Sequence, residues 1–423
     1  KGAVSNAQMP LFADMPQARP PITRLAEVPE LAGLKRYYTI ADFKLGGTYD
    51  LDNRKAYERG GRGGVTLESL GQGPLRTAYI AMGTPRRNQA GQIVNAIVIN
   101  AYYSGDSTKM VFFWHEGQPG VSFSNGPVVG PGRLIDTNAY YVVFVDALGL
   151  WGASKPSDGL GLDFPDYSYF DMVQVSYRLL RDKLNIARVK LATGVSMGGS
   201  VCYVWALLHP EFVDAIMPIA ANSTPDNVAR WIFLLMNAGL QSDPVWRATG
   251  GNYYHLPGNK QPGQGLMFGW SILSLTALTF DYRSRQAWDD VKGDVFYWQP
   301  RNGAGENLVA RAEDFDINDM IVRNRTCLKY NINDQLHRIR AKTLVLHAFT
   351  DQWLIYDKAA ETAGKIPGAR IIGYDSPLAH YACFRAPHLV KDEVIAFFKQ
   401  VGIAPGENMA GPAGKTAATK GGK

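Results

Sequence analysis

Apolar runs of strand length alternate with helix-like segments over much of the chain. The strand-length runs, rich in β-branched and aromatic residues, occupy 37–45, 77–83, 94–100, 140–145, 189–192, 213–221, 342–347 and 369–374. Continuous apolar runs of this kind are typical of parallel strands buried on both faces. Helix-like segments occupy 169–184, 199–209 and 387–401. The alternation predicts an α/β fold with a doubly wound, mostly parallel sheet and with ligands at the carboxyl ends of its strands.

The alternation stops between residues 223 and 340. This segment is rich in helical pattern, Trp and Met and shows little sign of a central strand. We interpret it as a helical cap inserted into the sheet domain, whose two parts are then 36–222 and 341–403. Prolines at five positions predict an extended surface arm over 1–35, and the Gly-, Ala- and Lys-rich end predicts a flexible tail over 404–423.

Composition narrows the classes of function. Of the 423 residues, 46% are hydrophobic and 19% charged, which is typical of a globular protein. The net charge is +6, but Lys and Arg are interleaved with acids, which argues against nucleic-acid binding. The longest apolar run, 268–280, is too short to span a bilayer and predicts a buried or amphipathic helix. The three cysteines are widely spaced without a C-x-x-C pair, so they indicate neither a disulfide framework nor a zinc site, although one disulfide stays open.

The chain begins at Lys1 rather than Met. Together with the basic balance of charge, this leads us to expect a protein exported after removal of a leader, to the periplasm or outside the cell. A cytoplasmic location is the alternative.

The motif with the most chemical content is Gly194-Val195-Ser196-Met197-Gly198. It follows a predicted buried strand and precedes a predicted helix, an order that indicates a nucleophile elbow with the Ser196 hydroxyl exposed above the sheet. We expect Gly194 and Gly198, which carry no Cβ, to let strand and helix approach closely while the turn takes dihedrals that other residues resist. The alternative is a chance glycine turn with a solvent-facing serine.

A serine hydroxyl becomes a good nucleophile when a histidine takes its proton, and that histidine needs a carboxylate to orient it. In sheets with such an elbow the chain order is Ser, acid, His. Asp351 follows the strand at 342–347, and His380 lies in the loop after the strand at 369–374, so we predict these two as the partners of Ser196. The remaining histidines lie ahead of the acid, in the cap, or inside a predicted strand or helix: His115, His209, His255, His337, His347 and His388.

The negative oxygen of an acyl-transfer intermediate needs two backbone N–H donors. One usually belongs to the residue after the nucleophile and the other to a loop after an earlier strand. We therefore predict the amides of Met197 and of Tyr103, which lies in the loop after the strand at 94–100.

These motifs, in this order, resemble the homoserine O-acetyltransferase family of α/β-hydrolase-fold proteins over most of residues 75–400. The similar segments are the elbow at 194–199, the segment 130–137, the cap motifs 243–244, 250–253 and 314–316, and the pairs Thr350-Asp351 and Ala379-His380. The resemblance implies an α/β-hydrolase fold with an inserted helical cap, and a homodimer formed through that cap.

The chain also departs from this family. The transferases carry a cap arginine for the carboxylate of the amino acid, where this chain has Asn237 or its neighbours, and an aspartate after the catalytic histidine, where it has Tyr381. The loss of two charged anchors, each typically worth ~1.5–3 kcal/mol, argues against homoserine as the substrate. The histidine-containing oxyanion loop is replaced by residues 101–104, and an aromatic insertion follows at 109–125. We expect a less polar substrate site shaped by Tyr102, Trp114, Asn237 and Tyr381.

Taken together, these features predict a serine hydrolase that cleaves a small-molecule carboxylic ester, or less readily an amide, through an acyl-enzyme on Ser196. Such chemistry needs neither a metal nor an organic cofactor. An acyl-CoA-dependent O-acyltransferase with an acceptor other than homoserine is the alternative, since it shares the first half-reaction. A third alternative is a non-catalytic binding protein that kept the fold. The presence of Ser, Asp and His in the expected order argues against it.

Overall fold

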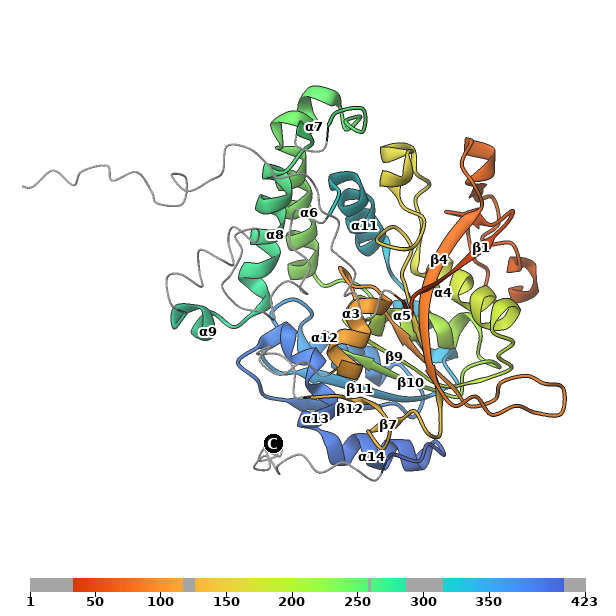
Figure 1. Cartoon of the computed structure of the whole chain (residues 1–423). Coiled ribbons are helices and arrows are strands. Elements are labelled where there is room, and N and C mark those ends of the chain that lie inside the picture. Colours follow the sequence, from red (N-terminus) through yellow and green to blue (C-terminus); the bar gives the residue numbers. More distant parts are fainter. Residues whose placement is uncertain (1–32, 117–125, 258–259, 287–314, 407–423) are drawn as a thin grey trace, which may run out of the picture.

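The computed structural model of this protein describes residues 33–116, 126–257, 260–286 and 315–406 (Figure 1). An eight-stranded sheet has the order β1-β4-β8-β5-β9-β10-β11-β12. Its strands are β1 (Arg36–Ile40), β4 (Leu75–Gly83), β8 (Tyr141–Val145), β5 (Ala96–Asn100), β9 (Val189–Val195), β10 (Ala215–Ile219), β11 (Lys342–Ala348) and β12 (Arg370–Tyr374). The strands from β8 to β12 in this order run parallel, whereas β4 is antiparallel to both of its neighbours. The predicted mostly parallel sheet of the α/β-hydrolase fold is confirmed.

Helices cover both faces of this sheet. One face carries α4 (Tyr169–Arg178), α5 (Met197–Leu208) and α12 (Tyr356–Gly364), and the other carries α3 (Ser107–Val111), α13 (Ala386–Leu389) and α14 (Lys391–Gln400). Alternate residues of each strand enter the two cores. In β8, for example, Val143 packs on the α5 side, and Val142 and Phe144 pack on the α14 side. Because both faces are buried, the strands are apolar throughout, which is why they were visible in the sequence.

The described residues between β10 and β11 form helices and no strand. These are α6 (Asn227–Gln241), α7 (Pro244–Thr249), α8 (Gln264–Ala277), α9 (Phe280–Ser284) and α11 (Ile317–Lys329), which we call the cap helices. In Figure 1, α6, α7, α8 and α11 stand together on one side of the sheet domain, with α6 packed against both α8 and α11. The exact boundaries predicted for the cap stay a prediction. Most of the predicted arm and tail, 1–32 and 407–423, lies outside the described residues.

Several predicted elements are divided in the structure. The run 37–45 splits into β1 and β2 (Lys44–Leu45), because Asp42 turns the chain with a left-handed φ of 55°. The closing helix splits into α13 and α14 at Val390, whose ψ of 45° is not helical. The apolar run 268–280 lies mostly in α8, which ends where Leu278 becomes extended, and its last residue, Phe280, begins α9. Two short pairs, β2 with β3 (Val65–Thr66) and β6 (Val129–Gly130) with β7 (Ile135–Asp136), complete the strands.

Two open questions from the sequence are answered within the described ranges. None of the helices there is long and apolar enough to cross a membrane. All three cysteines are described, and Cys202, Cys327 and Cys383 are buried free thiols.

Candidate active site

Ser196 sits in a strained turn between β9 and α5. Its φ of 56° and ψ of −124° lie in a region that residues with a Cβ rarely adopt, at a typical cost of ~1–3 kcal/mol. The turn is held in part by the Ser196 N–H, which donates to the Ile219 carbonyl of β10 at 2.8 Å. This geometry lifts the serine side chain out of the strand at its carboxyl end.

The flanking glycines permit a close approach of backbones. A Cβ on Gly194 would lie 2.8 Å from the carbonyl carbon of Gly198, and a Cβ on Gly198 would lie 2.5 Å from the Asn100 carbonyl oxygen. Neither glycine has a positive φ, since that conformation belongs to Ser196 itself. The two glycines therefore provide the close approach expected of them, and the unusual dihedrals of the turn are those of Ser196.

The structure brings the three predicted side chains together. His380 Nε2 lies 2.8 Å from Ser196 Oγ, and His380 Nδ1 lies 2.8 Å from Asp351 Oδ2. Asp351 follows β11 and His380 lies in the short helical turn Ala379–Phe384 after β12, so all three residues stand at the carboxyl ends of parallel strands. All three are buried, with 8%, 4% and 3% of Ser196, Asp351 and His380 exposed.

Asp351 is held as a charged group. Its Oδ1 accepts the backbone N–H groups of Trp353 and Leu354 at 2.8 and 3.1 Å. Burial by itself raises the pKa of the Asp351 carboxyl, but the neighbouring His380 and His347 and these hydrogen bonds outweigh it and lower the pKa below its ordinary value. The carboxylate is therefore ionised at neutral pH.

His347 was set aside as a strand residue, yet it lies beside the acid. Its Nε2 donates to the Leu354 carbonyl at 2.5 Å and is 3.6 Å from Asp351 Oδ2. Burial lowers the pKa of His347, which keeps its ring neutral. Nothing in the sequence around His347 distinguishes it from other strand residues, because its closeness to Asp351 depends on how the loop after β11 folds back.

Tyr103 and Met197 occupy the positions predicted for the oxyanion donors. Tyr103 lies in the loop after β5, and Met197 is the first residue of α5. Within the described part of the chain, neither backbone N–H donates to another protein group. Both residues line the same pocket as Ser196.

Buried charges anchor the loop that carries Tyr103. The Lys35 ammonium lies 2.7 Å from Asp106 and 3.1 Å from Asp146, and all three side chains are buried. Asp106 also caps α3 by accepting the Lys109 N–H at 2.9 Å. These contacts join the start of the described chain to the loops after β5 and β8.

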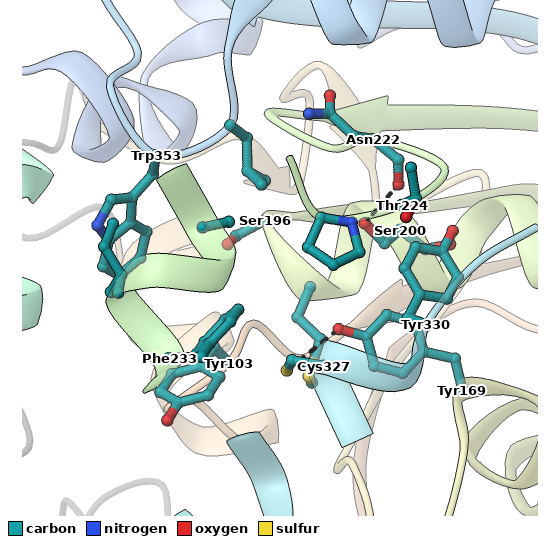
Figure 2. Close-up of a pocket in the computed structure, with 15 residues that line it drawn as sticks. Tyr103, Tyr169, Ser196, Ser200, Asn222, Thr224, Phe233, Cys327, Tyr330 and Trp353 are labelled. Carbon is teal, nitrogen blue, oxygen red and sulfur yellow. Dashed lines mark hydrogen bonds between the residues drawn. The ribbon is translucent and has the colours of Figure 1, made fainter. Parts of the chain in front are cut away.

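A pocket lies next to Ser196 (Figure 2). Its walls come from the elbow, from α6 through Ile232 and Phe233, and from the end of α11 through Cys327 and Tyr330. In Figure 2, Trp353, Phe233 and Tyr103 lie on the Ser196 side, and Tyr330 and Tyr169 lie across the pocket from them. Among the described residues that line it, none is Asp, Glu, Lys or Arg. The pocket therefore suits an uncharged ligand.

The four residues predicted to bind substrate are not among those that line this pocket. Tyr102 packs edge-on against Phe384, with ring centroids 5.1 Å apart, and Tyr381 is half-buried against the core on the α14 side. Asn237 accepts a hydrogen bond from Asn324 Nδ2 at 2.8 Å.

Trp114 requires a correction. It is fully buried in the core on the α14 side rather than placed in the substrate site. The predicted insertion begins within α3, which continues as a π-helical turn over Phe112–Glu116 and carries these aromatic residues inward. The second half of that insertion, 117–125, lies outside the described residues.

Two further residues at the site were missed. Trp353 lies two residues after Asp351 and contacts His380, with ring centroids 4.6 Å apart. Its closeness to the predicted acid in the sequence was the available signal. Arg323, inside α11, donates to the Tyr103 carbonyl across 220 residues of chain, and no local pattern indicates this.

No group of three or more His, Cys, Asp or Glu side chains that could hold a metal ion occurs in the described ranges.

Comparisons with known proteins agree with this fold. A family model described as alpha/beta hydrolase fold matches residues 132–376. The chain is 24% identical over 315 residues to a protein named "Probable acyltransferase" from Methanothermobacter thermautotrophicus, covering 74% of this chain and 88% of that protein. It is 34% identical over 236 residues to a homoserine O-acetyltransferase from Moorella thermoacetica, covering 53% of this chain and 58% of that protein.

A solved acetylester hydrolase from Corynebacterium glutamicum superimposes with a TM-score of 0.68 at 17% identity, covering 88% of this chain and 98% of that one. At this identity the likeness concerns the fold. The predicted resemblance to the homoserine O-acetyltransferase branch is confirmed by the curated relatives.

Proposed function

Because the chain belongs to the alpha/beta hydrolase fold family, we propose that it is a serine esterase that cleaves a carboxylic ester, and less readily an amide. The observation that carries the proposal is the position of His380 between Ser196 Oγ and Asp351 Oδ2, 2.8 Å from each. An imidazole whose Nδ1 proton points to Asp351 has its Nε2 lone pair directed at the Ser196 hydroxyl.

The reaction begins when Ser196 Oγ attacks the ester carbonyl and its proton passes to His380 Nε2. The ionised Asp351 stabilises the resulting imidazolium and keeps the ring oriented. His380 then gives the proton to the leaving alkoxide, so that the alcohol departs and the acyl group stays on Ser196. Water, deprotonated by His380, attacks this acyl-enzyme and releases the acid.

The amides of Met197 and Tyr103 stabilise the negative oxygen of each tetrahedral intermediate. Their N–H groups have no acceptor among the described protein groups, which leaves both available to the substrate oxygen. Preorganised donors of this kind typically contribute ~10²–10³ each to kcat.

The walls of the pocket indicate a neutral ester. Burying a charged group among Phe233, Trp353, Ile232 and Tyr330 without an opposite charge is strongly unfavourable. Both the acyl group and the alcohol are therefore expected to be uncharged.

Transfer of the acyl group to an alcohol other than homoserine is the second candidate. It is favoured by the similarity to proteins named as acyltransferases. Asn237, near the place where the transferases carry an arginine, hydrogen-bonds to Asn324 and supplies no charge for a carboxylate. The two candidates differ in whether water or an alcohol accepts the acyl group.

Mass spectrometry after brief incubation with p-nitrophenyl acetate or butyrate tests both, while p-nitrophenol release is followed. We expect an acyl adduct on the Ser196 peptide that clears in water alone. Ser196→Ala should form no adduct and lose a factor on the order of 10⁶ in kcat.

An adduct that persists until an alcohol or homoserine is added would favour acyl transfer. Unchanged turnover by Ser196→Ala would contradict an acyl-enzyme mechanism on Ser196. The absence of both adduct and turnover with either ester would favour a non-catalytic binding protein.

A further inference from the structure

Arg323 is a completely buried cation in α11. Its Nη1 donates to the Tyr103 carbonyl at 2.6 Å, and its Nε donates to the Tyr167 hydroxyl at 2.9 Å. Its Nη2 donates to the Leu148 carbonyl. The guanidinium therefore joins the loops after β5 and β8 to the segment that precedes α4.

The partners of this cation are neutral dipoles. In the described part of the chain, Arg323 forms no ion pair with a carboxylate. A buried guanidinium without an opposite charge is costly, and arginine stays protonated under all ordinary conditions. Since its contacts are uncharged groups, its positive charge is not cancelled locally and acts on the groups around it.

Those groups include both proposed oxyanion donors. Besides the Tyr103 carbonyl, Nη1 lies 3.5 Å from the Met197 sulfur. One guanidinium nitrogen thus contacts the two residues whose amides we assign to the oxyanion hole.

Tyr103 is held at both ends by consecutive residues of α11. Arg323 binds its carbonyl, and Asn324 accepts the hydrogen bond of its phenol hydroxyl. Asn324 in turn donates to Asn237 of α6 at 2.8 Å. The Tyr103 N–H belongs to the preceding peptide group, whose Tyr102 carbonyl accepts the Gly105 N–H at 3.0 Å. Arg323 holds the next peptide group and Asn324 holds the ring, so the backbone on either side of this N–H is restrained.

We propose that Arg323 is a positioning residue for the oxyanion hole, which orients the Tyr103 amide and adds a fixed positive charge behind both donors. The inference rests on the esterase function proposed above. In this arrangement the cap helix α11 supports transition-state stabilisation without touching the substrate.

Four variants test the inference. Arg323→Met keeps the side-chain volume and removes the charge, whereas Arg323→Lys keeps the charge. Tyr103→Phe removes the hydrogen bond of the phenol, and Arg325→Met is the matched control on the same helix.

Three quantities are measured for each variant: the rate constant of Ser196 acylation by p-nitrophenyl acetate, the inhibition constant of phenylboronic acid and the melting temperature. Phenylboronic acid forms a tetrahedral adduct with an active-site serine.

We expect Arg323→Met to acylate about 10²-fold more slowly and to bind phenylboronic acid more weakly by a similar factor, because both depend on the oxyanion donors. KM should change far less. Arg323→Lys should recover part of the rate, since its single ammonium retains the charge but cannot reach all three oxygens. Tyr103→Phe should show the same pattern more weakly, and Arg325→Met should match the wild type.

Acylation by Arg323→Met within threefold of the wild type would overturn the inference. So would slow acylation with unchanged phenylboronic acid binding, because that pattern indicates a structural role alone. If Arg323→Met does not fold, Arg323→Lys gives the decision by the same comparison of acylation and inhibition. If the wild type itself forms no adduct on Ser196, the proposed function fails and the inference fails with it. If the wild type and Arg323→Met are acylated at the same rate, only the inference is overturned.

Discussion

Trp353 packs against His380, with ring centroids 4.6 Å apart and planes inclined by 51°. The same residue donates its backbone N–H to Asp351 Oδ1 at 2.8 Å and its indole Nε1–H to Thr276 of α8 at 2.5 Å. Trp353 therefore connects the proposed acid, the proposed base and a cap helix. It also lines the pocket.

Replacement of Trp353 should lower catalysis more than stability. In Trp353→Ala the imidazole loses its packing partner, so we expect kcat for p-nitrophenyl acetate to fall by about one to two orders of magnitude, as expected when a catalytic group is misplaced. Trp353→Phe keeps a ring against His380 and should retain most of the rate. Equal kcat in the wild type, Trp353→Ala and Trp353→Phe would show that the contact between Trp353 and His380 does not orient the imidazole.

Asp351→Asn should remove most of the activity without unfolding the protein. An asparagine amide can hold His380 in the wrong tautomer, and such a change typically costs ~10⁴ in kcat. Esterase assays with circular dichroism as the check on folding measure this. Asp357→Asn is the matched control, because that carboxylate is exposed in α12 and its loss should leave kcat unchanged. A similar loss in both variants would argue against the assigned acid.

Asp171 should make stability depend on pH. Burial raises the pKa of this carboxyl to about 6, although hydrogen bonds from Tyr49, Ser168 and the Gly46 amide oppose the shift. Because the pKa is higher in the folded protein than in the unfolded chain, the folded state binds the proton more tightly. Its stabilising effect is complete below about pH 4 and is lost as the pH rises through about 6.

Between pH 4 and pH 7.5 the wild type should therefore lose roughly 2.5 kcal/mol of stability relative to Asp171→Asn, which cannot titrate. Urea unfolding of both proteins across this range measures the difference, and the contributions of other groups cancel. A difference that does not vary with pH would contradict the assignment.

The homodimer expected from the family resemblance has a suitable surface on the cap helices. Trp231, Leu234 and Leu235 of α6 are 67%, 56% and 46% exposed, and Phe268 and Leu275 of the adjacent α8 are 57% and 56% exposed. A cluster of large exposed apolar side chains is typical of an interaction surface. We predict that Trp231→Glu combined with Phe268→Glu converts a dimer to a monomer in analytical ultracentrifugation. A wild-type monomer, or a dimer that both substitutions leave intact, would rule out this surface.

The local pattern of apolar and polar residues was sufficient to predict the sheet and the order of the proposed catalytic residues along the chain. Strands buried on both faces must be apolar along their length, so β5, β8, β9 and β11 appear as continuous runs in the sequence. The elbow is equally local, because strand, glycine-flanked serine and helix follow one another. Once the carboxyl ends of parallel strands share one edge, the positions of Asp351 and His380 follow from the strands that precede them.

The surroundings of these residues were decided by packing between distant segments. Trp114 was expected to shape the substrate site, but a π-helical turn carries it into the core. Arg323 contacts Tyr103 and Asn324 contacts Asn237 across 220 and 87 residues of chain. Helical or strand periodicity reports which face of an element is buried, but it does not report which partner meets that face. For this reason the proposed nucleophile, acid and base could be predicted from the sequence, whereas the groups that hold them in place became visible only in the folded chain.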